Sequence, residues 1–171
     1  MALCFKIPDR TVIIMKMLKT IVSAVLACMM LTACSGGTEK AVDFEPADAV
    51  NEIVSTVEMS SMAEVQSDRL SSYIDYDQSK IQKYSLYICG SGGFADEVGI
   101  FKMDSETSVK DLEAVVKTRI ESRKVDFKDY NPDEYTKLEN ASIVQKGNYL
   151  FYCVTGDNDT AKSIFNKYYN K

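Results

Sequence analysis

The 171 residues of this chain contain no histidine, which limits the chemistry that it can perform. Histidine is the commonest general base near neutral pH and the commonest nitrogen ligand of metal ions. Carboxylates could still serve a hydrolase or a cation-dependent enzyme, and the candidates are Glu97 acting with Arg119, and Asp157 acting with Asp159. Since no nucleophile motif accompanies them, we expect no catalytic residue, no cofactor and no metal site.

Two short motifs invite a ligand-binding interpretation, and a structural one explains each more simply. Residues 90–93 read Gly-Ser-Gly-Gly, and backbone N–H groups in such a loop can hold an anion. The loop lacks P-loop spacing and precedes a strand-like segment instead of a helix, which favours a plain turn. Residues 156–159 offer oxygen ligands, as calcium loops do, but no closing glutamate follows. We expect Asp159 to cap a helix, with weak cation binding as the alternative.

Cys34 directly follows a hydrophobic leader. The run from Ile21 to Leu31 is apolar and follows Lys16 and Lys19, which is signal-peptide architecture. A permanent membrane-spanning helix is disfavoured because it needs about 20 uninterrupted apolar residues. The last residues of the leader and the cysteine, Leu-Thr-Ala-Cys, resemble the lipobox of bacterial lipoproteins, in which the signal is cut before the cysteine and its sulfur carries a diacylglyceryl group.

The lipobox resemblance divides the chain into three regions. Residues 1–33 are the expected signal peptide, within which 1–14 could stem from an upstream start codon. Residues 34–44 form a polar, flexible tether, and residues 45–171 form a single domain. We expect Cys34 to hold the mature protein at the extracytoplasmic face of the cell membrane through lipid. The alternative is an ordinary secretory leader in which this cysteine is a bystander.

The charge and the cysteines of the mature chain argue against further classes of function. Four of the 20 basic and one of the 25 acidic residues precede Cys34, which leaves 16 against 24 and a formal charge of −8. Such a surface repels nucleic acid, so we expect no nucleic-acid partner. Cys89 and Cys153 are too few and too far apart for a zinc ribbon or a C-x-x-C redox site. We expect buried thiols, with a disulfide between them as the alternative.

Hydrophobic periodicity predicts the order helix, hairpin, helix, hairpin, helix. The helices are expected from Pro46 to about Met59, after an N-cap at Ser108, and after Asp159. The strands are expected at 84–89, 97–102, 142–145 and 149–154. This order indicates an α+β fold, a four-stranded, mainly antiparallel sheet of two hairpins with helices packed on it, and the last strand at its centre because it is apolar on both faces. The residues expected to be buried are Val116, Ile120, Leu150, Tyr152, Ile164 and Phe165.

Several stretches taken together resemble one family. They are residues 72–74, 95–102, 127–132 and 146–149, with Arg119 and Arg123. As a set they resemble the DUF4358 family of small lipoproteins from Firmicutes, over about residues 62–165. That family has no assigned activity, so the resemblance implies a localisation and domain limits, and it carries over no catalytic residue.

Two functional hypotheses remain. The first is a non-catalytic envelope lipoprotein that binds a protein, a peptide or a cell-wall component, which fits the missing histidine and the ten tyrosines. The alternative is a surface hydrolase that uses carboxylates or a bound cation. For Glu97 the structural interpretation is an ion pair with Arg119 or Arg123, because a strand and the helix after it often pack together and a guanidinium can bind a carboxylate through two bonds.

Overall fold

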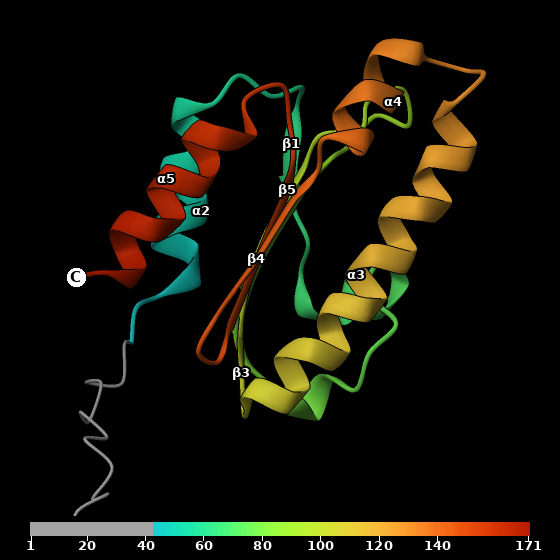
Figure 1. Ribbon diagram of the computed structural model, residues 1–171. Coiled ribbons are helices and arrows are strands. Elements are labelled where there is room, and N and C mark those ends of the chain that lie inside the picture. Colours follow the sequence, from blue (N-terminus) through green and yellow to red (C-terminus); the bar gives the residue numbers. More distant parts are fainter. Residues whose placement is uncertain (1–42) are drawn as a thin grey trace, which may run out of the picture. The chain divides into compact units, whose positions relative to one another are not determined.

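The computed structural model describes residues 43–171. Cys34 and the leader before it therefore lie outside the described residues, as does nearly all of the expected tether. Within the described part, an antiparallel sheet lies between two layers of helices (Figure 1). The expected α+β class with a mainly antiparallel sheet is confirmed, but the sheet has five strands instead of four.

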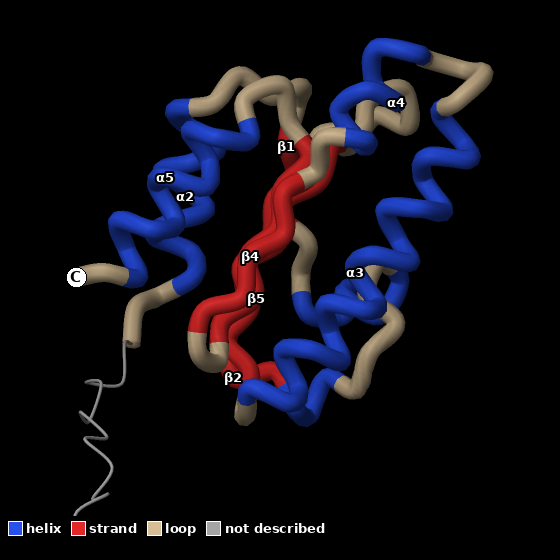
Figure 2. The backbone as a smooth tube through the Cα atoms, viewed as in Figure 1, coloured by secondary structure: helices blue, strands red, loops and turns tan. Residues whose placement is uncertain are grey.

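The order of the strands in the sheet is β1-β2-β3-β5-β4, and all neighbours are antiparallel. Figure 2 shows the strands in red between the helices in blue. The strands are β1 (Met62–Glu64), β2 (Ile81–Cys89), β3 (Glu97–Met103), β4 (Ser142–Lys146) and β5 (Tyr149–Val154). The helices are α2 (Pro46–Thr56), α3 (Glu106–Phe127), α4 (Pro132–Glu139) and α5 (Asn158–Tyr169), with the 3-10 helices η1 (Ser67–Ser72) and η2 (Gln78–Lys80).

The sheet differs from the expected one in two places. β1 was missed because it has only three residues, none of them buried, so it carries no alternating pattern. The centre of the sheet is β3, and β5 lies between β3 and the edge strand β4. Every residue of β5 is nonetheless buried, because helices cover both faces of the sheet. Apolar residues on both faces of the strand therefore indicated that helices pack on both sides of it. They did not indicate its position in the strand order.

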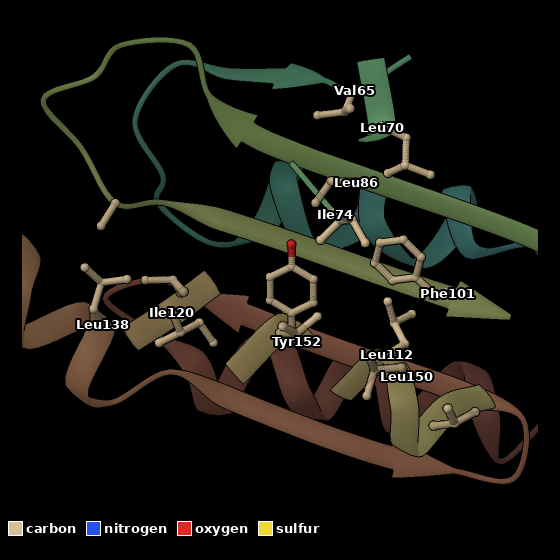
Figure 3. Close-up of a cluster of buried hydrophobic side chains, with 14 of the residues drawn as sticks. Val65, Leu70, Ile74, Leu86, Phe101, Leu112, Ile120, Leu138, Leu150 and Tyr152 are labelled. Carbon is tan, nitrogen blue, oxygen red and sulfur yellow. The ribbon is translucent and has the colours of Figure 1, made fainter. Parts of the chain in front are cut away.

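Two apolar cores lie on opposite faces of the sheet. On one face Phe101, Leu150 and Tyr152 pack with α3, α4 and η1, as Figure 3 shows for part of this cluster. On the other face Ile100 and Phe151 pack against α2 and α5. The alternation of side chains along β3 and β5 assigns neighbouring residues to different cores. All six residues that the sequence predicted to be buried are buried.

Two helices begin at other caps than expected. Ser105 caps α3, and its Oγ accepts a hydrogen bond from the backbone N–H of Ser108 at 3.2 Å. Asp157 caps α5, and its Oδ1 accepts from the backbone N–H of Thr160 at 3.0 Å. The expected caps Ser108 and Asp159 were wrong because both residues already lie inside the first turn. The apolar pattern marks the buried face of a helix, and its first turn can precede that pattern.

Candidate functional site

A buried carboxylate at the start of β3 is the centre of the candidate site. Glu97 is only 1% exposed. Arg119 and Arg123 lie one turn apart on α3 and therefore share the helix face that points at this strand. Arg119 donates from Nε to Oε1 of Glu97 at 2.7 Å and from Nη2 to Oε2 at 3.0 Å. Arg123 donates from Nη1 to Oε2 at 2.7 Å. The expected ion pair is confirmed, and it contains both arginines.

Tyr152 completes this cluster from β5. Its hydroxyl donates a hydrogen bond to Oε1 of Glu97. The register of the sheet places Tyr152 opposite Gly99. A Cβ at residue 99 would lie 2.7 Å from Cε1 of the tyrosine and 2.9 Å from Cε2 of Phe101. The missing side chain at Gly99 thus leaves the space in which the ring crosses β3 and its hydroxyl reaches the carboxylate.

The protonation states of Tyr152 and Arg119 follow from burial and from their contacts with Glu97. Burial first, and the Glu97 carboxylate second, raise the pKa of the Tyr152 phenol well above its ordinary value, so this hydroxyl stays a donor. Burial acts to lower the pKa of Arg119, but the hydrogen bonds and the attraction of Glu97 prevail and raise it. Two guanidinium groups share one carboxylate, which gives Glu97, Arg119 and Arg123 together a formal charge of +1.

The same arginines also bind the backbone around the site. Arg119 donates from Nη1 to the carbonyl of Tyr73 at 3.3 Å. Arg123 donates to the carbonyls of Ala95 at 3.0 Å and Phe94 at 3.2 Å. The cluster therefore joins α3, the loop before β3 and the segment after η1.

A second ionic cluster starts at the neighbouring residue, Asp96, which is fully buried. Lys137 of α4 lies 3.1 Å from Oδ1 of Asp96 and 2.9 Å from Oε1 of Glu134. The other oxygen of each carboxylate accepts a backbone N–H, from Ser60 at 3.1 Å for Asp96 and from Ala95 at 2.7 Å for Glu134. Although burial opposes it, hydrogen bonds to the two carboxylates raise the pKa of Lys137. These contacts attach α4 to the loop before β3.

A groove of about 540 Å³ runs along α3 beside the Glu97 cluster. The residues that line it are Tyr73, Asp75, Ala114, Val115, Thr118, Arg119, Ser122, Arg123 and Asp126. The ring of Tyr73 lies 5.5 Å from Cζ of Arg119, which places a cation against an aromatic face. The groove therefore borders the outer side of the two guanidinium groups whose inner side binds Glu97.

The other motifs considered in the sequence have local structural roles. Ser91 accepts a hydrogen bond from the backbone N–H of Gly93 at 3.3 Å, which belongs to a turn in the loop between β2 and β3. Cys89 and Cys153 are free thiols, the first half-buried and the second buried. Burial raises the pKa of the Cys153 thiol to about 12. Among residues 43–171, no three His, Cys, Asp or Glu side chains gather where they could hold a metal ion.

Sequence reasoning missed Tyr152, Asp96, Glu134 and Lys137 as members of ionic clusters. The spacing of Glu134 and Lys137 puts them on one side of α4, which was a weak signal. Asp96 next to Glu97 at the start of an apolar strand was a second signal, since charges seldom enter such a strand unpaired. Neither signal identified the partner, because the partners come from elements distant in the sequence.

Comparisons with known proteins identify the family of this chain. No curated protein and no solved structure matches the chain. In the part of the chain that the structure describes, no helix has the length and apolar character needed to cross a membrane. The family model described as a domain of unknown function (DUF4358) matches residues 55–155, which contain all five strands, α3, α4 and both ionic clusters. Because this match covers more than half of its length, the chain belongs to the DUF4358 family.

Proposed function

We propose that this protein is an extracytoplasmic lipoprotein, held at the cell membrane by lipid on Cys34, and that its domain is a non-catalytic binding module of the cell envelope. The leader and the Leu-Thr-Ala-Cys stretch before the tether support the anchor. The state of the buried carboxylates supports a binding module over the carboxylate-dependent hydrolase.

The observation that carries the proposal is the complete engagement of Glu97. Both of its oxygens accept hydrogen bonds, from Arg119, Arg123 and Tyr152, and its side chain is 2% exposed. A general acid or base must come within hydrogen-bond reach of its substrate, and Glu97 is enclosed by its own partners. Its contacts are those of a structural ion pair that connects the sheet to α3.

Three other carboxylates also have partners within the domain. Asp96 and Glu134 share Lys137 and bind backbone N–H groups. Asp157 caps α5, and hydrogen bonds from Thr160 lower its pKa. The occupant of the binding module would be an envelope protein, a peptide or a cell-wall component.

The anchor is tested by changing Cys34 to Ala. We expect the variant to move from the membrane fraction to the soluble fraction, or to stall before its leader is cut, because stable attachment depends on the lipid chains. Cys89→Ala is the matched control and should stay with the membrane, since Cys89 lies in β2. Normal cleavage with unchanged membrane attachment in Cys34→Ala would place the anchor elsewhere.

The choice between binding and hydrolysis is tested with Glu97→Gln. Wild type and variant are compared in an unbiased hydrolysis screen at temperatures where both remain folded by circular dichroism. On the proposed function neither protein turns over a substrate. A turnover that is present in wild type and lost in the folded variant would favour the hydrolase.

A further inference from the structure

We propose that the groove along α3 binds the free carboxylate of a short zwitterionic peptide through the outer N–H groups of Arg119 and Arg123. The inference rests on the proposed function as a binding module and specifies which surface binds and what chemical class of ligand it takes.

The arginines have donors left for a ligand. A guanidinium carries five N–H groups in a planar fork that suits a carboxylate. The bonds described above use three on each arginine, to Glu97 and to backbone carbonyls. Arg119 also has a hydrogen-bond contact with the Tyr152 hydroxyl. At least one N–H group therefore remains on Arg119 and two on Arg123, and both side chains line the groove with about a fifth of their surface exposed, 20% for Arg119 and 18% for Arg123.

Both guanidinium groups are fixed before a ligand arrives. Glu97 holds them from inside, and the ring of Tyr73 lies against Arg119. A side chain that is already ordered loses little conformational entropy on binding, which favours affinity. The cluster carries a formal charge of +1, so one positive charge is available to an incoming carboxylate.

The rest of the groove argues for a peptide instead of a simple anion. Asp75 and Asp126 line the same groove and would repel a phosphate or another ligand that carries only negative charge. The same two carboxylates can accept the ammonium group of a zwitterion. Ala114 and Val115 add an apolar end that suits aliphatic side chains, and the volume of about 540 Å³ is that of a small-ligand site.

The experiment uses trialanine with free ends as the probe and follows the backbone amide signals of the protein by NMR during the titration. We expect saturable shifts for residues of the groove at millimolar peptide. The C-terminal amide of trialanine should bind at least about tenfold more weakly, a loss of about 1.4 kcal/mol, because it lacks the carboxylate. Inorganic phosphate should not compete.

Two matched variants locate the site on α3. Ser122→Glu places a negative charge in the groove beside the arginines, and Val125→Glu places one on the same helix at an exposed position that does not line the groove. We expect Ser122→Glu to weaken trialanine binding at least about tenfold and Val125→Glu to leave it within about twofold. Both positions are exposed and neither change removes Glu97 or one of its partners, so both variants should remain folded, which circular dichroism checks before the titration.

The inference would be overturned by no saturable binding of trialanine to wild type, by equal binding of the peptide and its amide, or by equal effects of Ser122→Glu and Val125→Glu. Phosphate binding that competes with trialanine would also overturn it in favour of a general anion site. The proposed function fails differently, since it falls with the Cys34→Ala fractionation or with a hydrolytic turnover that Glu97→Gln removes.

Discussion

Replacing Glu97 by Gln keeps the shape of the side chain and removes the charge that two arginines share. Removing one partner of a buried ion pair typically costs about 3 to 5 kcal/mol, because the remaining charge stays desolvated without compensation. Here Arg119 and Arg123 keep their backbone carbonyl partners and are about one-fifth exposed. The lower end of the range, about 3 kcal/mol, is therefore the expected loss in the free energy of unfolding.

This loss is large enough to measure and small enough to leave a folded protein. Domains are stable by about 5 to 15 kcal/mol. For a domain of about 130 residues, each kcal/mol lowers the melting temperature by about 4 °C, so Glu97→Gln should melt about 12 °C below wild type. Thermal unfolding of the purified protein followed by circular dichroism measures the difference, and urea unfolding gives the free energy directly.

Glu121→Gln is the matched control on α3. Glu121 is paired with Lys124 at 2.7 Å, but its side chain is 68% exposed. Exposed ion pairs contribute little, so this variant should stay within about 0.5 kcal/mol of wild type. If Glu97→Gln loses no more stability than Glu121→Gln, then Glu97 does not tie the sheet to α3 and the argument for a structural carboxylate fails.

Four further outcomes are expected. Gly99→Ala should cost about 1 to 3 kcal/mol in urea unfolding, because its Cβ would lie 2.7 Å from the Tyr152 ring; an unchanged midpoint would mean that this ring can move aside freely. Leu150→Ala should cost about 2 to 5 kcal/mol as a truncation in the core, and a loss below about 0.5 kcal/mol would contradict the sheet assignment. At pH 8 an alkylating reagent should modify Cys89 before Cys153, as mass spectrometry can resolve, since the reactive thiolate is suppressed at Cys153; equal rates would contradict its burial. Because the folded-state pKa of Cys153 is about 12 and its ordinary value is 9.0, its contribution to stability is complete below pH 9 and is lost as the pH rises toward 12, which urea titrations at several pH values would detect.

The parts of the fold that could be predicted are those that depend on the spacing of residues close together in the sequence. Apolar residues at helical spacing marked the buried face of α3, because burial of one face imposes a period on the sequence. Two strand-like runs separated by a glycine-rich loop marked the hairpin of β2 and β3. β1 could not be found in this way, since its three residues bury no face. The caps Ser105 and Asp157 were missed for a related reason, because they lie before the periodic residues that identify their helices.

The candidate site was predictable in one contact and not in the others. A strand followed by a long helix suggested that Glu97 meets Arg119 or Arg123, since sequential elements tend to pack together. The bond from Tyr152 depends on the pairing of β3 with β5, which comes from the sheet order and has no local signature. The groove depends on the segment after η1 lying beside α3, and no spacing in the sequence encodes that approach.

The placement of α2 and α5 has a consequence for where the domain can be cut. The family match spans residues 55–155, whereas α2 (Pro46–Thr56) ends at its beginning and α5 (Asn158–Tyr169) starts after its end. These two helices form the layer on one face of the sheet, where they contact β2, β3, β4 and β5, and they pack against each other.

A protein trimmed to the matched residues would present Val98, Ile100 and Phe151 to water as a continuous apolar strip. Strips of this kind promote aggregation. Expression and solubility should therefore depend on retaining both flanking helices. The segment that folds as a unit is thus longer at both ends than the segment that the family model matches.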